Sequence, residues 1–137
     1  VVMLMLPSWG LGQGSAYVII INSSVNSEAL TKKNAHAIFM GRKRQWEETM
    51  PVRVGMLSKN NRHFIVFCRD FMKMTPLKLL RRWSHVKHSG IGKGYVSFQN
   101  SAELIHYVQK TPGAIGVVSE KYLAENKPEG IHYVTFK

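Results

Sequence analysis

Five consecutive polar residues near the middle of the chain have the side chains that an anion site needs: Ser58, Lys59, Asn60, Asn61 and Arg62. Hydroxyl and amide groups donate hydrogen bonds to oxyanions, and the two cations would make such contacts charge-assisted. The same composition is typical of an ordinary solvated turn between a strand and a helix. The residues alone leave both interpretations open.

The segments on either side of this polar run predict a strand and a helix. Residues 52–55 alternate between valines and other residues, which is the period of a strand. After the run, apolar residues recur at the i, i+3, i+4, i+7 spacing of one helix face: Phe64, Phe67, Cys68 and Phe71. We expect Asn60 or Asn61 to cap this helix. A helix that begins there directs free N–H groups and a partial positive charge at the polar run, which suits an anion.

No other residues have the spacing of a catalytic or metal-binding set. Asp70 is the only aspartate and falls on the predicted helix, so no serine–histidine–acid triad is expected. Glu47 and Glu48 are adjacent rather than facing, which is typical of a solvated loop. His85 and His88 are spaced i, i+3, but without a nearby Cys or carboxylate we predict surface histidines, not a structural zinc site. We therefore predict a protein that is not an enzyme and needs no metal or cofactor.

Cys68 is the only cysteine, so no internal disulfide can form. It falls on the apolar stripe of the predicted helix, which favours a small core residue over a nucleophile.

The charge of the chain is concentrated in its middle. Nineteen Lys and Arg residues stand against eight Asp and Glu residues, a formal net charge of +11. Between Lys32 and Lys93 there are fifteen basic and three acidic residues. Such an excess favours an anionic partner, namely a small oxyanion, a nucleic acid or an anionic lipid surface. A basic surface without a specific partner remains the alternative.

The first sixteen residues do not resemble a fold element. An apolar run is followed by Pro7, three spaced glycines and a small-residue end at Ser15-Ala16. This resembles the end of a secretory signal peptide, although a basic start is missing. We expect residues 1–16 to be a signal remnant or a disordered N-terminus, and the mature protein to be exported to the periplasm.

Residues 17–137 predict one α/β domain. Continuous apolar runs at 17–22 and 114–118 are typical of buried strands, and a last strand is expected at 131–136. Helix starts are expected at Thr31, at Thr75-Pro76 and at Asn100, which has capping-box spacing to Glu103. With short helices between them, these elements give a mixed sheet of about four strands flanked by helices.

Three segments in this order resemble the phosphate-type substrate-binding proteins of ABC transporters. They are Leu30–Trp46 (LTKKNAHAIFMGRKRQW), Val52–Phe67 (VRVGMLSKNNRHFIVF) and Ser89–Leu123, which contains SGIGKG and PGAIG. The resemblance covers roughly residues 18–123. It implies a single lobe of the type II periplasmic-binding-protein fold, similar to the short stand-alone members of that superfamily.

The resemblance implies an anion site in the polar run, although the family's Arg-x-Asp-Gly-Ser-Gly-Thr pattern is replaced. The acidic acceptor and both glycines are missing, and Ser58, Lys59, Arg62 and backbone N–H groups would hold the oxyanion. We expect the Asn22–Ser24 loop, with Ser23 and Ser24, to lie beside it, because ligands bind at the carboxyl ends of strands.

The expected function is non-enzymatic binding of a small, phosphate-like oxyanion. One lobe supplies half of a closed site, so tight capture would need a second chain, for which a homodimer or another lobe would serve, and a transporter is the expected partner. One alternative is a ligand-less interaction module whose basic middle docks an acidic protein, a polyanion or a membrane. Another is nucleic-acid binding through Gly41–Trp46 (GRKRQW), which would require that the N-terminus is not a signal.

Overall fold

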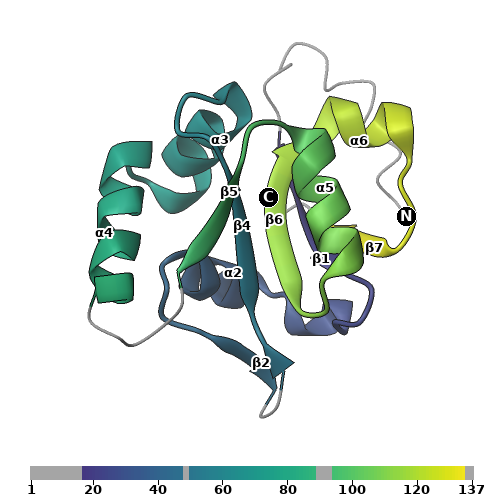
Figure 1. The fold of residues 1–137 in the computed structure, drawn as a ribbon, viewed down its shortest axis with the longest axis horizontal. Helices are drawn as coiled ribbons and strands as arrows, with labels where there is room; N and C mark the ends of the chain where they lie inside the picture. Colours follow the sequence, from purple (N-terminus) through teal and green to yellow (C-terminus); the bar gives the residue numbers. More distant parts are fainter. Residues whose placement is uncertain (1–16, 48–49, 89–93, 135–137) are drawn as a thin grey trace.

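A five-stranded mixed sheet forms the centre of the fold (Figure 1). The computed structural model describes residues 17–47, 50–88 and 94–134, so the predicted signal remnant and most of the SGIGKG loop lie outside the described residues. The strand order is β5-β4-β6-β1-β7. The bounds are β1 Tyr17–Asn22, β4 Arg53–Leu57, β5 Tyr95–Phe98, β6 Ala114–Ser119 and β7 Ile131–Val134. Strand β4 runs parallel to β5 and β6, whereas β1 runs antiparallel to β6 and β7.

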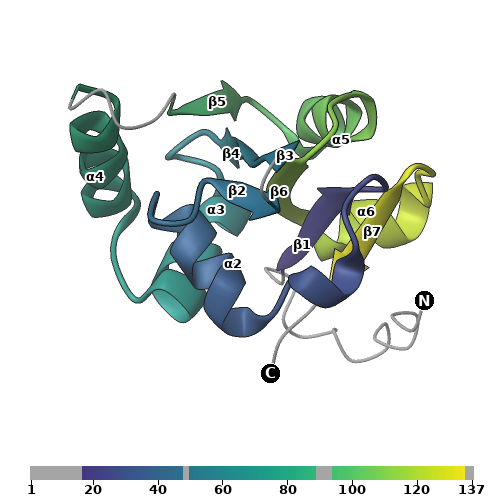
Figure 2. The same cartoon turned by 90° about the horizontal axis from the view of Figure 1, so that it is seen from below.

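Helices cover both faces of this sheet. They are η2 (Ser27–Ala29), α2 (Lys32–Phe39), α3 (Arg62–Phe67), the π-helical turn η3 (Cys68–Met72), α4 (Pro76–His88), α5 (Ser101–Lys110) and α6 (Glu120–Asn126). Figure 2 shows α5 and α6 on one side of the sheet and α2, α3 and α4 on the other. A short hairpin of β2 (Gln45–Glu47) and β3 (Met50–Pro51) precedes β4.

The crossover connections explain this layering. The chain passes from β4 to β5 through α3 and α4 on one face, and from β5 to β6 through α5 on the other. Parallel strands need such crossovers, and right-handed ones alternate faces when the direction of travel along the sheet reverses. As a result, the carboxyl ends of β4, β5 and β6 lie at one edge of the sheet, where α3, α5 and α6 begin.

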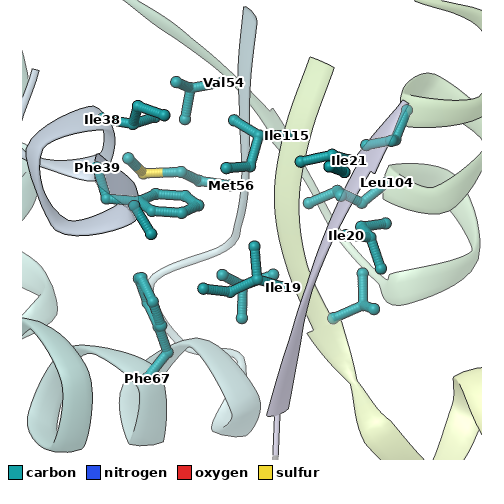
Figure 3. Packing of buried hydrophobic residues seen from close by; sticks show 14 of the residues in the cluster. Ile19, Ile20, Ile21, Ile38, Phe39, Val54, Met56, Phe67, Leu104 and Ile115 are labelled. Carbon is teal, nitrogen blue, oxygen red and sulfur yellow. The ribbon is translucent and has the colours of Figure 1, made fainter. Parts of the chain in front are cut away.

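The core lies on both sides of β1 and β6. Every residue of β6 is buried, as are five of the six residues of β1. Ile19 lies on the side of Phe67, and Ile20 on the side of Leu104 (Figure 3). Ring contacts extend the first side, since the centroids of Phe39 and Phe67 are 4.9 Å apart. The continuous apolar sequence of these strands therefore reflects burial on two faces.

Several local predictions are confirmed. Thr31 Oγ1 accepts a hydrogen bond from Asn34 N at 3.0 Å, which caps α2. Asn100 Oδ1 accepts from Glu103 N at 3.0 Å, and Glu103 Oε1 accepts from Gln99 N at 3.3 Å, which completes a capping arrangement at α5. Each cap satisfies N–H groups that the first helical turn leaves without partners.

The sheet has one strand more than expected. The additional strand is β5, at the edge of the sheet. Its sequence, YVSF, does not alternate between apolar and polar residues, and in the structure the two neighbouring residues Val96 and Ser97 are both exposed. The π-helical turn also departs from the regular helix that the spacing of Phe64 to Phe71 predicted, although Cys68 and Phe71 are still buried.

The aromatic residue of the GRKRQW segment packs in the core. Trp46 is buried, and its Nε1 donates to Gly113 O at 2.8 Å. Trp46 therefore holds the β2–β3 hairpin against the start of β6.

Gly113 is a junction of three segments. Its N–H donates to Ser24 Oγ at 3.2 Å, and its carbonyl oxygen accepts from Arg53 N at 3.0 Å as well as from Trp46. Its φ of +79° belongs to the left-handed region, and a Cβ atom there would collide with the carbonyl oxygen of Pro51.

We predict that Gly113→Ala destabilises the protein more than Gly130→Ala does. Both glycines have a positive φ, but a Cβ on Gly130 would meet only Gln109 Cγ at 4.0 Å. Strain alone should cost about 1–2 kcal/mol at either site, and the collision with Pro51 should add to the cost at Gly113. Urea unfolding would measure both, and equal losses of unfolding free energy would contradict the packing described here.

We also predict that Cys68 does not react with a thiol reagent in the native protein at neutral pH. Burial raises the pKa of its thiol to about 12, so the nucleophilic thiolate is scarce and also shielded. In denaturant the reaction should be fast, as a colorimetric thiol assay would show, with Cys68→Ser as the blank. Equal rates in the two states would contradict a core position for Cys68.

Candidate functional site

The polar run forms the turn between β4 and α3, at the carboxyl edge of the sheet. Ser58 N donates to Phe98 O at 2.9 Å, which fixes the start of the turn to β5. Asn61 N donates to Ser58 O at 2.8 Å, and Asn60 N lies 3.4 Å from Ser58 Oγ. These contacts hold the turn in one shape while the hydrogen of the Ser58 hydroxyl can still be donated to a ligand.

Asn61 is the residue that caps α3. Its Oδ1 accepts from His63 N at 2.9 Å and from Phe64 N at 3.4 Å. The expectation of several free N–H groups at this helix start therefore needs correction, because the protein's own side chain satisfies two of them. What remains for a ligand is the N–H of Arg62, the hydroxyl of Ser58 and the side chains of Lys59, Asn60 and Arg62.

The turn carries positive charge toward solvent. Lys59, Asn60 and Arg62 are exposed, and Ser58 is half-buried. Within the described chain, no hydrogen bond or ion pair of residues 58–62 involves a carboxylate. Two cations without a fixed partner can therefore meet an incoming anion.

The nearest acid along the helix is already paired. Arg69 Nε lies 2.7 Å from Asp70 Oδ1, and Arg69 Nη2 lies 3.2 Å from Asp70 Oδ2. The hydrogen bond from this guanidinium is the main cause that lowers the pKa of Asp70. An exposed pair of this kind adds little stability, but it offsets a negative charge that would otherwise oppose an anion.

The turn lies at the point of the sheet where the crossovers diverge. After β4 the chain passes to the face of α3, and after the neighbouring strand β6 it passes to the face of α6. Open α/β sheets place ligands at such a switch point, outside the carboxyl ends of the strands.

The sequence analysis did not single out the residues that follow β6 at this edge. Ser119 is buried; its N–H donates to Ser101 Oγ at 3.1 Å, and its own Oγ accepts from Tyr122 N at 3.2 Å. Glu120 follows, and burial raises the pKa of its carboxyl group. The strand-then-serine pattern at 114–119 was the available signal. Glu120 adds a negative charge to this edge and would repel an anion. The anion would therefore contact the residues at the start of α3 rather than those at the start of α6.

The prediction that the Asn22–Ser24 loop lies beside the polar run is wrong. Because β1 is antiparallel to β6, with Tyr17 opposite Ser119 and Ile21 opposite Ile115, its carboxyl end lies at the opposite edge of the sheet. Ser24 Oγ there accepts from Gly113 N, and Ser23 N donates to Gly130 O at 3.1 Å. The structure therefore does not bring Ser23 and Ser24 together with residues 58–62.

A shallow groove of about 580 Å³ lies elsewhere, between the end of β5 and α5. Its lining includes Phe98, His106, Tyr107 and Lys110 but none of the residues 58–62. The ring centroids of Phe98 and Tyr107, which both line it, are 5.1 Å apart. The polar turn is thus an open surface site rather than part of this hollow.

The described residues contain no group of three or more His, Cys, Asp or Glu placed to hold a metal ion. Within the same residues, no helix has the length and apolar character needed to cross a membrane.

We predict that Asn61→Ala lowers the free energy of unfolding by about 1 kcal/mol, the usual loss for a helix cap. Asn61→Asp keeps an oxygen acceptor for the same N–H groups and should remain near wild type. Chemical denaturation of the two variants side by side measures the cap. A loss of similar size in both would show that Asn61 acts through something other than this cap.

Comparison with known proteins identifies the fold. No family model matches the sequence, and no curated protein is similar to it in sequence. Among solved structures, PstS from Borrelia burgdorferi superposes with a TM-score of 0.66 at 12% identity, over 88% of this chain and 46% of that protein. An ABC-type phosphate transport receptor from Vibrio cholerae gives 0.61 at 12% identity, over 88% and 45%. A possible phosphate-binding protein from Planctomyces limnophilus gives 0.62 at 18% identity, over 88% and 41%. The chain spans less than half the length of these proteins, and its fold, a mixed sheet flanked by helices, is similar to part of their periplasmic-binding-protein fold.

Proposed function

We propose that this protein binds a small phosphate-like oxyanion at the β4–α3 turn and performs no chemistry on it. The observation that carries the proposal is the position of Ser58–Arg62 at the switch point of the sheet, in a fold whose neighbours include a phosphate transport receptor and a possible phosphate-binding protein. Ser58 Oγ, the N–H of Arg62 and the side chains of Lys59 and Arg62 would donate to the anion. Charge-assisted hydrogen bonds of this kind are stronger than neutral ones.

The capped helix start suggests weak capture by one chain. Asn61 occupies two N–H groups that a deeper anion site would use, and the exposed turn leaves the other side of a ligand in water. Tight binding would then require a second surface, from another copy of this chain or from a second lobe. By the same proposal the protein is exported to the periplasm and hands its ligand to a transporter. Sedimentation with and without phosphate would show whether the anion brings two copies together.

We predict that inorganic phosphate or sulfate binds at low salt and that Lys59→Gln with Arg62→Gln weakens this binding at least tenfold. The loss follows because a hydrogen bond to a charged group is worth about 1.5–3 kcal/mol. Isothermal titration is the measurement. Lys110→Gln with Lys127→Gln removes the same charge from the last turn of α5 and the C-cap of α6, where both residues are exposed and lie at the opposite edge of the sheet, and should bind as wild type does.

Asn61→Asp sharpens this test, since it keeps the helix cap but adds a negative charge beside the proposed ligand. It should therefore fold normally and bind phosphate less well than wild type. No heat from wild type, or an equal loss in the Lys110/Lys127 control, would reject the site and leave only the fold.

A further inference from the structure

We propose that the outer side of α4, together with the segment after Gly41, is a docking surface for an anionic phospholipid membrane. We call it the α4 basic face and define it by Arg42, Lys78, Arg81 and Arg82, with Leu77 among them. It is separate from the oxyanion turn and does not depend on the function proposed above.

Two segments about forty residues apart are fixed together to form this face. Arg82 Nε donates to Met40 O at 2.8 Å, and Trp83 Nε1 donates to Phe39 O at 2.7 Å. Gly41 has a φ of +79°, and a Cβ atom on it would lie 3.1 Å from Val86 Cγ2. The end of α2 therefore rests directly on α4, and Arg42 follows immediately after the segment that Arg82 holds.

Two cations of α4, Lys78 and Arg81, lie on the side of the helix that faces away from the core. Leu79, Trp83 and Val86 are buried on one side of the helix. At 100° per residue, the opposite side holds Leu77, Lys78, Arg81 and His85, all of which are exposed. Arg42 is exposed as well. Within the described chain, none of Arg42, Lys78 and Arg81 has an ion-pair partner.

Acidic residues are missing from the sequence around this face. No Asp or Glu occurs in residues 29–46 or 71–102, and five of the eight acids lie outside residues 32–93. Three of those five fall on the α5 and α6 side of the sheet: Glu103, Glu120 and Glu125. Attraction to an anionic surface is consequently directed to one side of the molecule.

The apolar content of the face favours lipid over nucleic acid. Leu77, which is 52% exposed, sits next to Lys78 and one turn from Arg81, as expected where a helix meets lipid head groups. Trp46 and Trp83, the tryptophans of this region, are buried at 7% and 5% exposure and cannot stack on bases.

The test is co-sedimentation of the full chain with mixed phosphatidylglycerol–phosphatidylcholine vesicles, compared with pure phosphatidylcholine. We expect binding to the anionic vesicles only, weakened by added salt. Each Lys or Arg near an anionic membrane strengthens binding about fivefold, so Arg42→Gln with Arg81→Gln should weaken it about 30-fold. Lys110→Gln with Lys121→Gln, which removes the same charge from the other side, should cause less than about a fivefold change.

A second variant separates lipid from other polyanions. Leu77→Ser should weaken vesicle binding by about threefold or more, because the variant loses a leucine side chain that would be buried among lipid head groups on binding, and should leave binding to a DNA duplex unchanged. Binding to the duplex but not to anionic vesicles would overturn the lipid assignment. Equal losses in the Arg42/Arg81 variant and the Lys110/Lys121 control would overturn the face itself.

Discussion

Burial of β6 on both faces is the constraint from which the rest of the fold follows. A strand with six buried residues needs a helix layer on each side, and its parallel pairing with β4 requires a crossover that supplies one. The packing is close, because a Cβ atom on Gly116 would run into Leu104 of α5. Once both faces are covered in this way, the connections after β4 and β6 leave from the same edge on opposite sides. The location of the polar turn is therefore a result of how the core is closed.

Features that depend on a few neighbouring residues could be predicted from the sequence. The caps at Thr31 and Asn100 are hydrogen bonds between a side chain and the backbone N–H three residues later, so residue type and spacing were sufficient to predict them. The direction of β1 could not be predicted in the same way. It depends on a pairing between Tyr17 and Ser119, more than a hundred residues apart, and an apolar run is the same whether its strand lies parallel or antiparallel to its neighbours. The error on Ser23 and Ser24 follows from that missing direction.

The candidate site was predictable in position and only partly in chemistry. A strand, a polar turn and an amphipathic stripe placed residues 58–62 at the start of a helix, and the structure has them there. The sequence could not tell that Asn61 Oδ1 would take both His63 N and Phe64 N, because the choice between capping by Asn60 and by Asn61 depends on the backbone geometry of the turn. Nor did it indicate that Glu120 would stand at the same edge, since the adjacency of β4 and β6 is a property of the sheet order. The resemblance to phosphate-type binding proteins predicted a periplasmic-binding-protein-like fold, and the structural neighbours confirm that fold.

The uneven distribution of charge between the two helix layers has a consequence of its own. Fifteen of the nineteen cations fall between residues 32 and 93, whereas three of the eight carboxylates lie on α5 and α6, so the molecule has a permanent electric dipole moment as well as a net charge. A charged plane or a large ion exerts a torque on such a body before any atoms touch, so the protein arrives already turned with one side forward. The interactions that hold Gly41 against α4 thus do more than join two helices, because they help to fix the axis about which the whole protein orients.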